Sequence, residues 1–410
     1  MSIYSTSVAL PYILFACIQI FCSYCVPKQN YGRLTQKTLY VYGILFSYVS
    51  FLIFFGLRGG IFSDWYSYKL VFDKCPTLPD ALFRHKKFPV ESLYMEIGFR
   101  YYVAFFKTFL RNYFIFQSID FFIDFLFLQQ AFNFFLEKKD YSLFFSCLLA
   151  LDGVYIFFII LRNAKVIVLF LYSLKYFGMK RYFWYFFLNF IGFFFHSSAI
   201  IYVIIFPILF SKCNRKLVLL LYVFGNIVYI LDISFANVLL SFLADSVGGS
   251  LGTMGKLMAR YTRIFNDSMR GINIGYLEKN IYFLLVFFSQ KRVLSIKPEC
   301  KSLYILFYCY MFLYLYFSDS RAFIERLAIM FSCSLWFLLP SIYNTLKPSR
   351  EKTLFKLLFQ MYVTMKVFMN QRIIAGKYYF AFQMTDGQVK ESKKIIELCN
   401  KVVMKGRKQS

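Results

Sequence analysis

GLRGGIFSDWYSYKLVFDKCP, residues 56–76, and the acid of MEIGFRYY, residues 95–102, set the plan of this chain. They follow an apolar run of the length that a membrane-spanning helix needs. That run delivers Arg58, Asp64 and Glu96 to one end of a span, and charged groups at the mouth of a membrane protein are where binding and chemistry gather. The alternative is an ordinary solvated loop with snorkelling side chains.

The composition predicts a membrane protein. Of the 410 residues, 59% are hydrophobic and 23% aromatic, which is more apolar surface than a soluble core of this size buries. Several runs reach about 20 residues, enough to cross about 30 Å of hydrocarbon as a helix, and they do not alternate as barrel strands do. The predicted fold is all-α, a polytopic integral membrane protein of about 11 transmembrane helices plus interfacial helices.

The net charge of +26 does not indicate a nucleic-acid partner. Most basic residues lie in short loops and in the tail, which is where a protein of the cytoplasmic membrane carries them on its inner side. After Pro340 the chain has fourteen Lys or Arg against four Asp or Glu, a balance that favours contact with anionic lipid. We therefore expect a transmembrane domain, 1–340, and a basic, membrane-associated cytoplasmic tail, 341–410, in which 354–370 lies at the interface.

The loop charges also predict the orientation of the chain in the cytoplasmic (inner) membrane, with the N-terminus outside and the C-terminus in the cytoplasm. Two long loops, 57–96 and 234–275, are then extracytoplasmic, and the short segment 97–110 is an interfacial helix. If 97–110 crossed the membrane, every later assignment would invert. The predicted crossings are 8–25, 39–56, 113–136, 141–161, 164–178, 182–195, 198–210, 217–233, 276–290, 302–317 and 322–340.

This topology sorts the charges by side. Most of the positive charge of the loops faces the cytoplasm, whereas the candidate binding and catalytic side chains gather at the outer face. The gathered residues are Arg58, Asp64, Glu96, Arg162, His196, Arg260, Arg263 and Arg321.

Arg162 ends the apolar run YIFFIILR, with Lys165 one helical turn further on. A cation near the bilayer centre costs about 2.5–3.5 kcal/mol on insertion scales, so it needs a partner or a function. The functional interpretation is a clamp for an anionic substrate group, because a guanidinium grips phosphate oxygens in pairs. The alternative is snorkelling at the interface.

Two residues are candidate bases. His196, in FFFHSSAIIYVIIFP, can accept a proton near pH 7 or bind a sugar hydroxyl, and the alternative is a packed, hydrogen-bonded histidine. Asp64 lies among aromatic residues in FSDWYSY, a setting that suits sugar recognition through Tyr66 and Tyr68. His85, in the loop peptide RHKK, is expected to be solvated.

Acidic residues within predicted spans are functional candidates by default. Asp120 and Asp124 have helical i, i+4 spacing, and their alternative role is to pair with Lys165 or with arginine side chains. For Arg321 and Glu325 the alternative to substrate binding is an internal ion pair. No P-loop, Rossmann fingerprint or metal-ligand motif occurs, so we expect no cofactor and no metal.

Several segments, in order over about 40–340, resemble the EpsG-type polysaccharide polymerases, which are related to the O-antigen (Wzy-like) polymerases. They are GLRGGIFSDWYSY, MEIGFRYYVAFF, ILRNAKVIVLFLYSLKYFGMKRY, FFFHSSAIIYVIIFP and ERLAIMF. The chain departs from the family pattern at Asn163, where Gln is usual, and in Gly59–Ser63. These departures leave the substrate open.

The resemblance implies a membrane glycosyltransferase that joins repeat units carried on undecaprenyl diphosphate into O-antigen, capsule or exopolysaccharide at the outer face of the cytoplasmic membrane. Arg58, Arg162 and Arg321, with Arg260 and Arg263, would neutralise the leaving diphosphate, and His196 or Asp64 would be the base. Tyr66, Tyr68, Glu96 and Glu325 would bind substrate. The expected partners are the lipid-linked oligosaccharide, membrane lipids, and chain-length regulator and flippase proteins. The alternatives are a flippase for lipid-linked sugars and a membrane O-acyltransferase.

Overall fold

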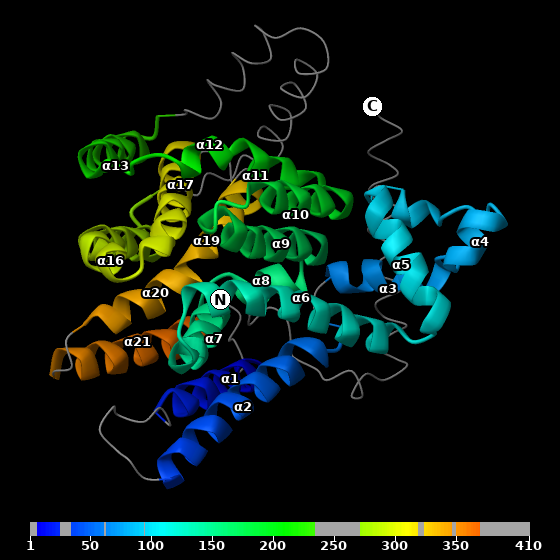
Figure 1. Ribbon diagram of the computed structural model, residues 1–410, viewed down its shortest axis with the longest axis horizontal. Helices are drawn as coiled ribbons and strands as arrows, with labels where there is room; N and C mark the ends of the chain where they lie inside the picture. The colour runs from blue at the N-terminus through cyan, green and yellow to red at the C-terminus, as the bar shows by residue number, and fades with distance from the viewer. Residues whose placement is uncertain are drawn as a thin grey trace, which may run out of the picture. The chain divides into compact units, whose positions relative to one another are not determined.

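The computed structural model describes residues 6–24, 34–60, 63–93, 95–233, 271–318, 324–346 and 350–369. The described residues form helices and contain no β-strand, which confirms the predicted all-α fold. Figure 1 shows these helices in chain order by colour. They belong to two compact units, one made of the chain up to Ile204 together with the chain from Thr353 onward, which includes most of the last helix, and one made of Ile205 to Lys352.

The first unit holds the segment 56–102 and everything that packs on it. Its α-helices are α1 (Thr6–Tyr24), α2 (Leu34–Gly56), α3 (Ser63–Lys74), α4 (Leu78–Phe83), α5 (Ile97–Phe109), α6 (Tyr113–Phe135), α7 (Tyr141–Ala150), α8 (Gly153–Phe158), α9 (Leu161–Gly178), α10 (Tyr182–Phe195), α11 (Ile200–Ile204) and α21 (Arg350–Met369). Short 3₁₀ turns lie at η1 (Val90–Ser92), η2 (Lys138–Asp140) and η3 (Ser197–Ala199).

Aromatic rings form the core of this unit. Phe51 of α2 is fully buried and stacks on Phe145 of α7 with the ring centroids 4.3 Å apart. Phe15 of α1 stacks on Phe54 of α2 at 4.5 Å. Such pairs contribute about 0.5–1.5 kcal/mol each beyond their buried area, so the aromatic side chains hold α1, α2 and α7 together.

The second unit contains α12 (Phe206–Leu209), α13 (Arg215–Ile230), α16 (Ile274–Ile296), η4 (Pro298–Cys300), α17 (Lys301–Phe317), the π-helical turn η5 (Ile324–Ala328), α19 (Ile329–Ser332) and α20 (Ser334–Thr345). Helix α17 is its centre. Tyr308 of α17 donates a hydrogen bond to Gln290 of α16 at 2.9 Å, and Tyr316 donates to the Leu221 carbonyl of α13 at 2.8 Å.

The predicted number of crossings is not confirmed. Among the described residues, two helices are long and apolar enough to cross a membrane, Thr38–Gly56 and Pro298–Phe317. The bent pair Tyr113–Phe135 and Lys138–Ala150 makes a third if it counts as one span, and its two arms differ in direction by 118°. The predicted run 141–161 is interrupted at Leu151 and Asp152, between α7 and α8. Apolar composition alone does not reveal such a break.

Two predicted helices outside the crossings are present. The segment predicted to be interfacial is α5, whose 13 residues would extend about 20 Å, short of the hydrocarbon thickness. Within the predicted tail, α21 packs on α1, where Lys356 donates to the Ser23 carbonyl at 2.7 Å and Tyr24 donates to Gln360 at 2.6 Å. The division at residue 340 concerns membrane sides and stays a prediction, as do both termini's orientations.

A candidate substrate site around Glu96, Arg162 and His196

The segment after α2 is tied to the first turns of α6. Trp65 of α3 is fully buried and donates its indole N–H to Gln117 of α6 at 2.6 Å. The Gln117 amide in turn donates to the carbonyls of Gly56 at 3.1 Å and Arg58 at 2.8 Å. The end of α2, the start of α6 and α3 therefore meet at one end of the unit.

Helix α5 reaches the same end through a close approach to α10. A Cβ atom added at Gly98 would lie 2.4 Å from the Phe194 Cβ and 2.5 Å from the Phe194 carbonyl oxygen. No side chain fits at that distance, so glycine at position 98 lets the start of α5 contact the end of α10. This contact carries Glu96, the residue before α5, to the turn that follows α10.

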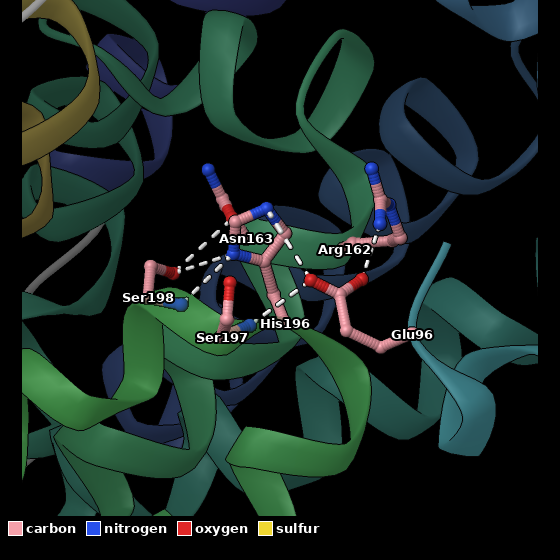
Figure 2. Close-up of polar contacts among 6 residues, drawn as sticks. All are labelled: Glu96, Arg162, Asn163, His196, Ser197 and Ser198. Carbon is pink, nitrogen blue, oxygen red and sulfur yellow. Dashed lines mark hydrogen bonds and ion pairs between the residues drawn. The ribbon is translucent and has the colours of Figure 1, made fainter. Parts of the chain in front are cut away.

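Glu96 joins three segments that are far apart in the sequence (Figure 2). One of its oxygens, Oε2, forms an ion pair with Arg162 at the start of α9. The other, Oε1, accepts the backbone N–H of Ser197 at 3.0 Å and lies 3.9 Å from Nε2 of His196. The predicted outer-face residues Glu96, Arg162 and His196 are thus brought together in the structure.

The local contacts of His196 fix where its proton lies. Its Nδ1 accepts the backbone N–H of Ser198 at 3.1 Å, and the Ser198 hydroxyl is 2.8 Å from the same nitrogen. In a neutral ring, an accepting Nδ1 leaves the proton on Nε2, which is the nitrogen that faces Glu96. The Ser198 hydroxyl also lies 3.4 Å from the Asn163 side-chain oxygen, linking the ring to α9.

The environment keeps Glu96 ionised. Burial raises the pKa of its carboxyl, but the Ser197 N–H and the positive charge of Arg162 together lower it by more, so the pKa lies below the ordinary value of 4.5. The Glu96 side chain is still 21% exposed, and that of His196 is 26% exposed. The cluster is therefore partly open to solvent.

Helix α3 brings a further candidate, Tyr68, to the cluster. The Arg162 guanidinium donates a hydrogen bond to the Tyr68 hydroxyl oxygen, and the Tyr68 ring packs edge-on against Phe99 of α5. Asp64 is half-buried, four residues before Tyr68 in the same helix, so the two lie on one face a turn apart. Tyr66 is directed elsewhere, since its hydroxyl donates to the Gly60 carbonyl at 3.3 Å.

Arg58, also predicted to neutralise the diphosphate, is more buried than Arg162. Its side chain is buried, donates to the Phe55 carbonyl, and has its guanidinium carbon 4.9 Å above the Phe158 ring. These contacts fasten the end of α2 to α8. Binding of substrate by Arg58 stays a prediction, and at 1% exposure it would require the side chain to leave this position.

The acids predicted inside the span of α6 have a partner. Lys165 of α9 is 2.5 Å from Asp120 and 3.0 Å from Asp124, and the Tyr102 hydroxyl donates to Asp120 at 2.5 Å. All three charged side chains are at most 11% exposed. The ion-pair alternative for these acids is confirmed. The network fixes α9 against α6 at Lys165, one helical turn after Arg162.

Four predicted site residues lack a structural test. Arg260, Arg263 and Arg321 lie outside the described residues, and for Glu325 only the backbone, within η5, is described. Within the described part of the chain, no three His, Cys, Asp or Glu side chains are grouped as metal ligands.

Sequence reasoning missed several parts of the site. Gln117 and Tyr102 look like ordinary residues of apolar helices, and a backbone donor such as the Ser197 N–H leaves no sequence signal. The break of the aromatic runs at His196 was visible, and the structure places the end of α10 there.

Comparison with known proteins assigns this chain to a family. A family model described as the EpsG family matches residues 41–384, which is most of the chain. The chain belongs to the EpsG family. This is a family of polysaccharide polymerases, and the match spans the whole Glu96, Arg162 and His196 cluster. No curated protein and no solved structure matches the chain.

Proposed function

We propose that this EpsG-family chain is a membrane glycosyltransferase that polymerises oligosaccharide repeat units linked to undecaprenyl diphosphate, at the outer face of the cytoplasmic membrane. The observation that carries the proposal is the cluster itself. A guanidinium, an imidazole N–H and a carboxylate converge from α9, the turn before η3 and the start of α5 at a partly exposed point, in a member of a polymerase family.

The leaving group of this reaction is a lipid diphosphate. The acceptor hydroxyl oxygen attacks the anomeric carbon of the growing chain, the bond from that carbon to the diphosphate oxygen breaks, and its electron pair stays on the diphosphate. Arg162 neutralises the charge that develops there, because a guanidinium donates two parallel bonds to phosphate oxygens. Its position at the beginning of α9 is held by Tyr68 and by the Lys165 network.

The proton of the acceptor hydroxyl passes to Asp64 or His196. Asp64 is the better base in this geometry, because Nδ1 of His196 already accepts the Ser198 N–H and Nε2 carries the proton. Asp64 and Tyr68 lie on neighbouring turns of α3, and the Tyr68 hydroxyl accepts a hydrogen bond from Arg162 of α9, so Tyr68 connects the helix of the base to the diphosphate clamp. The product is the lengthened chain on the incoming lipid carrier.

Deleting the gene and sizing the surface glycan tests the proposal. Loss of a polymerase leaves single repeat units on lipid or at the cell surface, and an Arg162→Ala variant should reproduce that result. Repeat units stranded on the inner leaflet would instead identify a flippase, and unchanged chain length with altered acylation an O-acyltransferase. Either outcome would overturn the proposal.

A further inference from the structure

We propose that the groups holding Glu96 form a phosphate-binding site, and that the Glu96 carboxylate is an internal competitor for it. The inference rests on the proposed function, since a lipid diphosphate is the anion that this site would bind. It adds the atoms of the site and a role for Glu96 that differs from contact with sugar.

The donor set is that of a phosphate site. The Arg162 guanidinium, the Ser197 backbone N–H and Nε2 of His196 all face the two oxygens of one carboxylate. Phosphate oxygens take the same donors, and guanidinium forks and backbone N–H groups are their usual partners in proteins. An anion that binds Arg162 here must share these donors with Glu96 or displace it.

The Glu96 side chain can leave its partners without loss of hydrogen bonds in α5, the helix that follows it. It precedes α5 in an extended conformation, and its side chain makes no capping hydrogen bond to that helix. Its recorded side-chain bonds instead run across to α9 and η3. Displacing the carboxylate therefore breaks contacts between segments and leaves the first turn of α5 intact.

Exposure separates this cluster from the buried network of Lys165, Asp120 and Asp124. Arg162 and Glu96 are 15% and 21% exposed, whereas Lys165 is 4% exposed and held by both Asp120 and Asp124. The first cluster has one carboxylate beside its cation and the second has two, but only the first is exposed enough for an incoming anion to reach its cation. Glu96 thus lowers the affinity of Arg162 for diphosphate and favours release of the cleaved lipid carrier.

The test measures binding of farnesyl diphosphate to the purified, detergent-solubilised full chain by calorimetry, with farnesol as the uncharged probe. Glu96→Gln should bind farnesyl diphosphate about tenfold more tightly than wild type, because the competing charge is gone. Arg162→Ala should lose this binding in both backgrounds, and farnesol binding should not change. Glu91→Gln is the matched control, since Glu91 pairs with the exposed Lys74 and the substitution removes the same charge outside the cluster.

Unchanged or weaker binding by Glu96→Gln, or equal tightening by Glu91→Gln, would overturn the inference. If Glu96→Gln does not fold, Glu96→Asp carries the test: its shorter carboxylate keeps the charge but withdraws from Ser197, and we expect intermediate tightening. These readouts do not use polymerisation. If the wild type polymerises but Glu96→Gln does not bind farnesyl diphosphate more tightly, only the role of Glu96 as a competitor is refuted. If Glu96→Gln binds more tightly but the wild type does not polymerise, only the proposed function is refuted.

Discussion

At the scale of single residues, function depends on which charged groups are held by buried partners and which are exposed enough to meet a substrate. Arg162 and His196 could be selected from the sequence because a cation and an imidazole interrupt long apolar runs, and the cost of burying them demands an explanation. Their common partner Glu96 was identified only as a substrate-binding candidate. Its pairing depends on the backbone N–H of Ser197 and on the close approach at Gly98, neither of which a sequence pattern displays.

The geometry of His196 leads to a prediction that separates a base from a hydrogen-bond donor. In His196→Gln the amide nitrogen takes the place of Nε2–H, so we expect at least about a tenth of the wild-type polymerisation rate, whereas loss of a true general base would cost about 10²–10⁴-fold. The measurement is the rate of glycan extension by His196→Gln, His196→Ala and Asp64→Asn. A fully inactive His196→Gln that still folds, beside an active Asp64→Asn, would make His196 the base.

The lowered pKa of Glu96 predicts a pH dependence of stability. A carboxyl whose pKa falls on folding contributes stability that is complete above its unfolded value of 4.5 and is lost as the pH falls through the lower folded value. Wild type should exceed Glu96→Gln in unfolding free energy near pH 7 by about 1 kcal/mol or less, because solvent screens a partly exposed pair. Thermal unfolding of both proteins from neutral to acid pH checks this, and a gap that widens in acid would contradict it.

At the scale of elements, apolar periodicity located the helices but not their breaks. The helices on both sides of His196 and the short α5 are where the sequence placed them. The single span predicted over 141–161 is divided, because Asp152 and Gly153 begin a new helix, α8, within an otherwise apolar run. The count of about 11 crossings assumed that each apolar run forms one continuous helix, and several runs do not.

Gly98 gives a prediction about how elements meet. A methyl group at this position would overlap Phe194, so Gly98→Ala should force α5 away from α10, with a cost of about 1–3 kcal/mol as for other overpacked contacts. Separation of α5 from η3 should also remove the Ser197 bond to Glu96 and alter diphosphate binding. Gly56→Ala is the control, because its added Cβ would lie 3.5 Å from the nearest atom, an ordinary contact. Equal unfolding temperatures for the two variants would refute the close approach.

At the scale of the whole molecule, the proposal needs one end of the first unit to face away from the cytoplasm. The end of α2, the starts of α5, α6 and α9, and the end of α10 are connected there by the bonds of Gln117 and Glu96. The distribution of Lys and Arg among the loops predicts that these same points lie on one side of the membrane. It does so because loop charges report membrane orientation, whereas packing contacts do not.

Cysteine labelling of intact cells tests this orientation. Lys74 at the end of α3 and Lys180 after α9 are both exposed, so each can be replaced by cysteine and compared with wild-type labelling. We expect Lys74→Cys to react with a membrane-impermeant maleimide in intact cells and Lys180→Cys to react only after permeabilisation. Reaction of both positions from the same side would contradict the predicted topology.

Reconstitution in liposomes tests whether this chain polymerises lipid-linked repeat units and whether Arg162 is needed for it. Purified chain in liposomes is given lipid-diphosphate-linked repeat units in the presence of a chelator, and the products are sized. The account predicts a ladder of extended chains from wild type and from Arg84→Ala, whose arginine is exposed and paired with Asp80, and a rate at least about 10²-fold lower for Arg162→Ala. Single repeat units from the wild type, or a full ladder from Arg162→Ala, would contradict it.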